Sequence, residues 1–285
     1  MRMKNKMGRS CVKVAAAMAF ALAASAAMAV QPMPTNELVT ITRPRTYVSE
    51  GLEWIQYRLY VPEGLAPDAK VPLVVYLHGS GACGSDNVLN LRDGPDYMIA
   101  YSRATRTPVI VVSPQCPQRY GWSPLFWTPE SAVVTPEPLK MERLVRELID
   151  QCVDTLPVDT NAVLLTGVSL GGFGAWSMLA HNPDLFAAVM PVCGGGDPKA
   201  CARFRKVPIW IVHGERDGVV PVKLARAMVS ELWRLDAPVR YREVPDAGHA
   251  VWGTYGDDSL LKWFFSRRKQ PPPVPPAAGA KRPAR

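Results

Sequence analysis

Short, uninterrupted apolar runs alternate with amphipathic stretches along most of this chain, and no other feature restricts its fold as strongly. The runs cover residues 71–77, 109–112, 162–165, 187–192, 207–212 and 239–244. Such runs are typical of strands covered on both faces, as in a parallel sheet. Stretches with helical spacing of apolar residues lie at 141–152, 170–180, 221–235 and 257–265. We therefore predict an α/β fold, a mostly parallel central sheet of about eight strands with helices on both faces.

Two further strand-like runs precede this alternating pattern. Residues 38–48 are rich in β-branched side chains, and residues 54–61 form an extended run that ends at Pro62. A turn at Glu50-Gly51 separates them. We expect the two runs to pair as an antiparallel hairpin.

The N-terminus has the composition of an export signal. Basic residues precede an alanine-rich apolar run at 14–30, and Ala27-Met28-Ala29 has the small-x-small form of a cleavage site. The run is shorter than the ~20 apolar residues that span a bilayer. We therefore predict a signal peptide at 1–29 rather than an uncleaved anchor, and no stable membrane insertion once it is removed. A catalytic domain would follow at 30–266, and a disordered, Pro-rich basic tail at 267–285.

The formal charge of +8 does not indicate a nucleic-acid partner. Lys and Arg gather in residues 1–13 and 267–285, where no Asp or Glu occurs, so the body between them is slightly acidic. No C-x-x-C pair or histidine cluster predicts a metal site. Cleavage after Ala29 would leave an odd number of cysteines, so at least one would be a free thiol or bonded to another chain. These cysteines are Cys83, Cys116, Cys152, Cys193 and Cys201.

The most specific motif is Gly167-Val168-Ser169-Leu170-Gly171, a G-x-S-x-G sequence. It follows an apolar run and opens a predicted helix, which is the strand–turn–helix context of a nucleophile elbow. Glycines at its flanks suit a turn too tight for side chains. We expect Ser169 to be a nucleophile rather than an incidental serine in a glycine-rich turn.

A serine nucleophile needs a base, and the four histidines allow a choice by elimination. His78 lies far upstream, His181 ends a helix, and His213 occupies a packing position before a glycine. His249 alone lies in a short polar loop between the last strand and the last helix. A nucleophile elbow is followed along the chain by the acid and then by the histidine, and this loop is where the histidine is expected.

The acid that orients the base should follow the strand at 207–212. Asp217 and Glu215 both qualify by position, and we favour Asp217 because it lies at the tip of its loop. Asp246 is closer to His249 in sequence but fits a turn.

Acyl transfer also needs N–H donors for the developing oxyanion. We expect one from Leu170, after the nucleophile, and one from Ser80, with Gly81 next, in the glycine-containing loop after the third strand. Trp122, Phe126, Trp127 and Trp252 lie in loops that should follow strand ends. Trp122, Trp127 and Trp252 are predicted to shape the substrate pocket; the alternative is that such rings pin a loop to the body.

These motifs resemble those of bacterial α/β-hydrolases related to prolyl oligopeptidase and dienelactone hydrolase, often described as predicted peptidases or carboxylesterases. The resemblance covers roughly residues 71–265. Its motifs are Leu77-His78-Gly79-Ser80-Gly81, Gly84-Ser85-Asp86-Asn87, Ser113-Pro114-Gln115-Cys116-Pro117, 166–176, Cys193-Gly194-Gly195-Gly196-Asp197, 213–217 and Ala247-Gly248-His249.

The resemblance implies the α/β-hydrolase fold, a triad of Ser169, Asp217 and His249, no cofactor, and small-molecule ester substrates more often than peptides. We expect no propeller domain before residue 71, unlike in prolyl oligopeptidases, and serine stands where dienelactone hydrolases have a cysteine nucleophile. Cys83 and Cys116 follow strands that are neighbours in this fold, which suggests a disulfide between them.

We therefore expect an exported serine carboxylesterase, periplasmic or secreted. A serine peptidase or amidase is the main alternative. A non-catalytic binding module on the same fold is a third, although the full set of site residues argues against it. The oligomeric state is left open.

Overall fold

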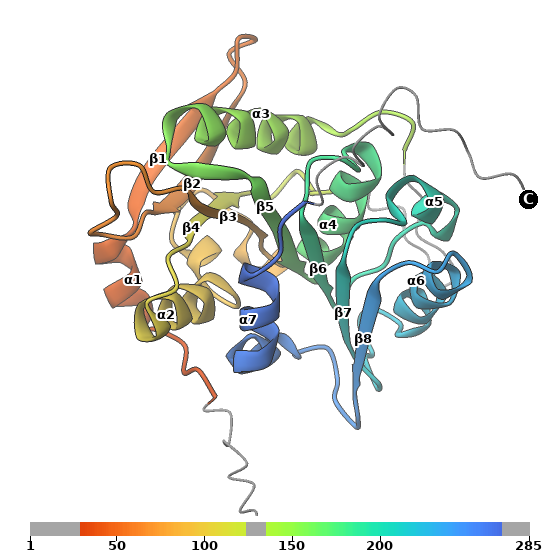
Figure 1. Ribbon diagram of the computed structural model, residues 1–285. Helices are drawn as coiled ribbons and strands as arrows, with labels where there is room; N and C mark the ends of the chain where they lie inside the picture. Colours follow the sequence, from red (N-terminus) through yellow and green to blue (C-terminus); the bar gives the residue numbers. More distant parts are fainter. Residues whose placement is uncertain (1–28, 124–134, 270–285) are drawn as a thin grey trace, which may run out of the picture.

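Residues 29–123 and 135–269 are described by the computed structural model, which arranges them as a twisted sheet between two layers of helices (Figure 1). The strands are β1 (Arg43–Val48), β2 (Trp54–Tyr60), β3 (Val71–Leu77), β4 (Ile110–Gln115), β5 (Val158–Val168), β6 (Ala188–Val192), β7 (Ile209–Gly214) and β8 (Val239–Val244). The helices are α1 (Thr35–Ile41), α2 (Pro95–Thr105), α3 (Lys140–Thr155), α4 (Leu170–His181), α5 (Cys201–Phe204), α6 (Lys223–Arg234) and α7 (Asp258–Phe265). Nearly all of the predicted signal peptide, and residues 270–285 of the predicted tail, lie outside the described residues.

The eight strands follow the order β1-β2-β4-β3-β5-β6-β7-β8. β1 pairs with β2, and β2 with β4, in antiparallel register, while all other pairs are parallel. The predicted mostly parallel sheet and the N-terminal hairpin are both confirmed. Because β3 to β8 run in one direction, the loops that follow them gather at one edge of the sheet.

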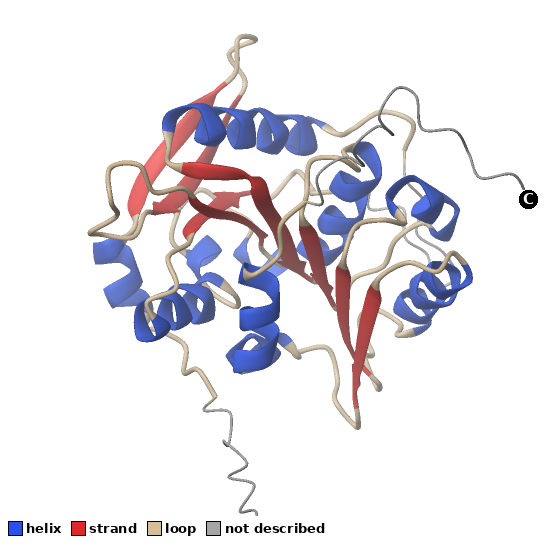
Figure 2. Cartoon of the chain, in the orientation of Figure 1, coloured by secondary structure: helices blue, strands red, loops and turns tan. Residues whose placement is uncertain are grey.

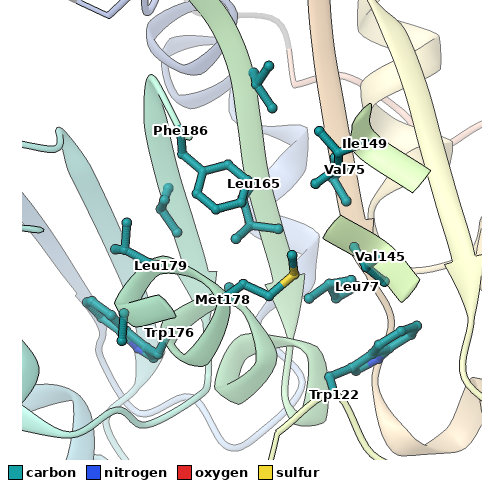
Figure 3. Close-up of a cluster of buried hydrophobic side chains, with 14 of the residues drawn as sticks. Val75, Leu77, Trp122, Val145, Ile149, Leu165, Trp176, Met178, Leu179 and Phe186 are labelled. Carbon is teal, nitrogen blue, oxygen red and sulfur yellow. The ribbon is translucent and has the colours of Figure 1, made fainter. Parts of the chain in front are cut away.

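Each strand of the sheet centre has a buried side chain on both faces. In β3, Leu73 and Val75 pack toward α3, α4 and α6, whereas Val74 and Tyr76 pack toward α1, α2 and α7. The two helical layers are visible on either side of the strands in Figure 2, and Figure 3 shows part of the first cluster, between α3, α4 and the sheet. This two-sided burial explains why the strand sequences contain continuous apolar runs rather than alternating ones.

The strand expected at 38–48 begins only at Arg43, because residues 35–41 form helix α1. Leu38 is fully buried by this helix, and the Thr42 hydroxyl donates to the Leu38 carbonyl at its end. The β-branched residues that suggested a strand each cost a helix ~0.7 kcal/mol or less relative to alanine. Burial of Leu38 outweighs that local preference.

Helix α2 was not predicted from the sequence. It begins at Pro95, a favourable first helical residue, and buries Met98, Ile99 and Tyr101 against the sheet. At the other end of the chain, the residues after α7 still contact the body: the Lys269 N–H donates to the Asn161 carbonyl, and Arg268 forms an ion pair with Asp159 at 2.7 Å.

The turn from β5 into α4 passes close to β3. A Cβ added at Gly171 would lie 1.8 Å from the Leu77 carbonyl oxygen, and one added at Gly167 would lie 2.4 Å from the Gly171 carbonyl oxygen. Neither obstacle is a flexible side chain, so the backbone itself would have to move. Glycine at both positions is therefore required by close backbone packing.

We predict that Gly171→Ala lowers the free energy of unfolding by about 3 kcal/mol, since overpacking against rigid backbone costs at least the upper part of the usual 1–3 kcal/mol. The thermal midpoint, followed by circular dichroism, should fall by roughly 6–12 °C. The matched control is Gly51→Ala in the exposed hairpin turn, where the nearest atom would be 3.8 Å away. Equal midpoints for the two variants would contradict the packing argument.

Candidate active site

Ser169 occupies the turn between β5 and α4 in a strained backbone conformation. Its φ of 53° and ψ of −114° lie where residues other than glycine are uncommon. The Ser169 N–H donates to the Val192 carbonyl at 2.9 Å, which fixes the turn against the end of β6. The side chain is half-buried. Strain of this kind concentrates at functional sites, and this is the geometry expected of a nucleophile elbow.

The structure brings Ser169, His249 and Asp217 into one hydrogen-bonded chain. The Ser169 Oγ lies 2.9 Å from His249 Nε2, and His249 Nδ1 lies 2.7 Å from Asp217 Oδ2. The three residues follow β5, β8 and β7 respectively, so strands far apart in sequence deliver them to one edge. This arrangement can transfer a proton from the hydroxyl to the imidazole and hold the imidazolium that results.

The Asp217 carboxylate is held by three polar groups besides His213, which is described below. Its Oδ1 accepts the N–H groups of Val219 and Val220, both at 2.8 Å, while Oδ2 faces His249. Its side chain is fully buried. The alternative acid, Glu215, accepts the Asp246 N–H at 2.9 Å and forms no hydrogen bond or ion pair with His249 within the described residues. Of the two acids considered, Asp217 is the one beside the imidazole.

His213 supports the same carboxylate, a contact that the sequence did not indicate. It is fully buried, and its Nε2 lies 2.9 Å from the Val220 carbonyl oxygen and 3.2 Å from Asp217 Oδ2. Burial lowers the pKa of His213, so the ring stays neutral and its Nε2–H is shared between the two oxygens. His181 lies elsewhere, beside Glu142 and the Thr135 carbonyl.

The loop after β3 lies opposite the serine. Gly79 is next to the serine: an added Cβ would be in van der Waals contact with the Ser169 Cβ, at 3.6 Å. Ser80 and Gly81 begin the short 3₁₀ turn η1 (Ser80–Ala82), whose first N–H groups have no acceptor within the turn. Leu170 likewise begins α4 beside the serine. All three expected N–H donors are thus at the first residues of helical turns near Ser169.

A buried polar network holds this loop in place. The Gln115 amide donates to the Ala82 carbonyl at 3.0 Å and accepts the Asn87 N–H at 2.6 Å. The Arg58 guanidinium, itself buried, donates to the Asn87 carbonyl at 2.6 Å. Asn90 donates to the Asn87 side chain at 3.0 Å. Buried networks of this kind rigidify the segment that they join, although the Asn90 Oδ1 has no hydrogen-bond partner among the described residues.

His78 joins the ends of β3 and β4. Its Nε2 accepts the Cys116 N–H at 2.9 Å, so the proton is on Nδ1, which donates to the Gly79 carbonyl at 2.7 Å. Burial lowers the pKa of His78 to about 4, because the charged ring would lose its hydration. The folded protein therefore needs this histidine neutral.

We predict that His78→Gln makes the free energy of unfolding less sensitive to acid. Between about pH 6.5 and 4, unfolded His78 is protonated and folded His78 is not, so the unfolded state binds more protons and stability falls with falling pH. Above about pH 6.5, His78 does not lower the stability of the folded state. By pH 4 it lowers the free energy of unfolding by roughly 3 kcal/mol.

The comparison with the variant is necessary because burial raises the pKa of Asp96 to about 6, which acts in the opposite direction in both proteins. Urea titrations at several pH values should show the stability difference between wild type and His78→Gln changing by roughly 3 kcal/mol across this range. A constant difference would rule out His78 as the source.

The cleft beside Ser169 has a volume of about 260 Å³. Trp252, in the 3₁₀ turn η4 (Trp252–Gly256), lines it as expected and meets the His249 ring edge-on, with ring centres 6.0 Å apart. Ser80, Gly81, Ser169 and His249 also line it, whereas other lining residues were not predicted. They include Ala82, Leu89, Arg92 and Asp93, from the long loop after β3.

Trp122 is not at the cleft, and its expected role in the substrate pocket is wrong. The side chain is 1% exposed and belongs to the core cluster between α3, α4 and the sheet (Figure 3). Its indole N–H donates to the His78 carbonyl at 2.9 Å, so the ring pins its loop to the end of β3. Phe126 and Trp127 lie outside the described residues.

The five cysteines of the described residues are all free thiols, so the expected disulfide between Cys83 and Cys116 is not formed. The two side chains do lie in contact, and their hydrogen bond lowers the pKa of Cys83. Within residues 29–123 and 135–269, no group of three or more His, Cys, Asp or Glu side chains could hold a metal ion. In the same ranges, no helix has the length and apolarity needed to cross a membrane.

Comparison with known proteins finds esterases among the similar chains. A solved thermostable esterase is 34% identical, with a TM-score of 0.76 over 82% of this chain and 64% of that one. A bifunctional acetylxylan esterase/xylanase from Neocallimastix patriciarum is 26% identical over 209 residues, 68% of this chain but only 27% of that protein. The feruloyl esterase module from Clostridium thermocellum is 16% identical with a TM-score of 0.61, over 86% of this chain and 96% of that one, which shows a common fold.

The sheet order, the helices on both faces and these structural neighbours identify the α/β-hydrolase fold. Residues 52–264 match the protein family described as "Putative esterase". This match extends from β2 to α7 and includes every residue of the hydrogen-bonded chain. The chain is therefore a member of that esterase family.

Proposed function

We propose that this protein hydrolyses carboxylic esters through an acyl-enzyme on Ser169. The observation that carries the proposal is the hydrogen-bonded chain Ser169–His249–Asp217, with distances of 2.9 and 2.7 Å. Membership of an esterase family supports a small-molecule ester as the substrate. The chain's own side chains suffice for this reaction, which requires no cofactor.

The reaction proceeds in two steps. His249 Nε2 takes the Ser169 proton as Oγ attacks the ester carbonyl, and Asp217 stabilises the imidazolium. The tetrahedral oxyanion is held by the Leu170 N–H and by the Ser80 N–H, or that of Gly81 beside it. His249 then protonates the leaving alcohol. Water activated by the same imidazole releases the acid and restores the hydroxyl.

Export is part of the proposal. The basic, alanine-rich segment at 1–29 supports a signal peptide that delivers the enzyme to the periplasm or the exterior. An uncharacterised secreted protein from Arthroderma benhamiae is 24% identical over 69% of this chain, although the chain covers only 23% of that protein.

Substrate size is tested with p-nitrophenyl esters from acetate to decanoate, together with a feruloyl ester. We expect hydrolysis of the shorter esters, because the cleft is only about 260 Å³. The Ser169→Ala variant should lose at least about 10⁴-fold in kcat, since the residual rate comes from binding and oxyanion donors alone. Undiminished hydrolysis by the variant would refute the acyl-enzyme, and a preference for amides over esters would favour a peptidase.

The identity of the acid is tested separately. Asp217→Asn should lower kcat by about 10⁴-fold, because an amide favours the wrong imidazole tautomer. Glu215→Gln is the matched control, two residues away and without contact to His249, and its kcat should stay within about twofold of wild type, the spread of a surface substitution. A larger loss for Glu215→Gln than for Asp217→Asn would reverse the assignment.

A further inference from the structure

One wall of the cleft carries two opposite charges that acyl transfer does not use. Arg92 and Asp93 both line the cleft with Ser169 and His249. They lie in the short connection between the 3₁₀ turn η2 (Leu89–Leu91) and α2. Arg92 is exposed and Asp93 is half-buried.

Asp93 is held in an unfavourable state. Its φ of 64° is left-handed, which costs a residue other than glycine about 1 kcal/mol or more. Its carboxylate has no hydrogen-bond donor among the described residues, and burial raises its pKa. The neighbouring Asp96, by contrast, accepts the N–H groups of Gly94 and Tyr97. Asp93 is thus a partly desolvated acceptor that faces the cleft without a partner.

Arg92 supplies the complementary group. It forms no ion pair within 4 Å in the described part of the chain, and its charge acts on Asp93 by lowering the pKa that burial raises. A guanidinium is donor only, whereas a carboxylate is acceptor only. Side by side, the two can bind hydroxyl groups, each of which both donates and accepts.

The position of this pair indicates which part of the ester it meets. Gly94, next to Asp93, packs on the ring of Tyr76 in β3, since an added Cβ would lie 2.3 Å from that ring. Gly256 of η4 packs beside Tyr97 of α2, the helix that follows Asp93, and an added Cβ there would lie 3.3 Å from the Tyr97 ring. The Arg92–Asp93 segment therefore lies on the same side of the site as η4, where Trp252 touches His249. His249 protonates the departing alcohol in the proposed reaction, so we assign this wall to the alcohol rather than to the acyl group.

We propose that Arg92 and Asp93 form a subsite for an alcohol that carries further hydroxyl groups, such as a sugar or another polyol. Asp93 accepts a hydrogen bond from one hydroxyl, Arg92 donates to a neighbouring oxygen, and Trp252 provides the apolar surface. An alkyl alcohol would desolvate both charges without replacing their water, which a polar site resists strongly. This assignment rests on the proposed esterase activity.

The test compares three acetates: a monoacetylated methyl glycoside, cyclohexyl acetate, and p-nitrophenyl acetate. The protein is expressed from the full-length sequence. Asp93→Asn should fold normally, because asparagine tolerates a left-handed backbone. We expect kcat/KM for the glycoside ester to fall about tenfold, the loss of one charged hydrogen bond, and that for cyclohexyl acetate to stay within about twofold.

Asp236→Asn is the matched control. Asp236 also has a left-handed φ, of 53°, is exposed, and lines a separate depression with Arg203 and Arg205. Its variant should treat all three esters as wild type does.

The outcomes separate the two proposals. If Asp93→Asn affects the glycoside and cyclohexyl esters equally, or neither, while p-nitrophenyl acetate is still hydrolysed through Ser169, the subsite is overturned and the esterase assignment stands. If wild type cleaves none of the three, both proposals fall together.

Discussion

The contact between Gly171 and the Leu77 carbonyl determines how everything at the active edge is arranged. It brings the first turn of α4 onto the end of β3, so that the N-terminus of the helix and the loop at Gly79 face each other across Ser169. Ser169 lies in this compressed turn with a positive φ of 53°. A single extra methyl group in this turn would separate the elements that the chemistry requires together.

The negative charge of Asp217 at this edge is stabilised by a series of contacts that starts at a buried residue. His213 is neutral and buried, and it supports Asp217 from below, while two backbone N–H groups fix the other carboxylate oxygen. Asp217 then orients His249. These donors offset the cost of burying the carboxylate where water is largely excluded. They leave Oδ2 to accept the hydrogen bond of His249. The position of the His249 imidazole therefore depends on the buried His213, which acts on it through Asp217.

The sequence predicted most of the frame because the frame depends on burial. The apolar runs located β3 and β8 at their observed bounds, and the order of Ser169, Asp217 and His249 matched the topology. The predictions were wrong where tertiary contacts outweighed local preference. Residues 35–41 form a helix that buries Leu38 although the segment is rich in β-branched residues. Trp122 is buried in the core, where its indole donates to the distant His78 carbonyl. Arg92 and Asp93 were missed because no periodicity marks residues of an irregular loop.

The two sheet edges have a further consequence. β1 carries Arg43, Pro44 and Arg45 along its exposed length, and β8 carries Arg240, Arg242 and Glu243. Proline removes a backbone donor, and flanking charges oppose the approach of another strand. These features oppose the pairing of a strand of another copy with either edge of the sheet. They protect both edges against the aggregation that open sheets favour.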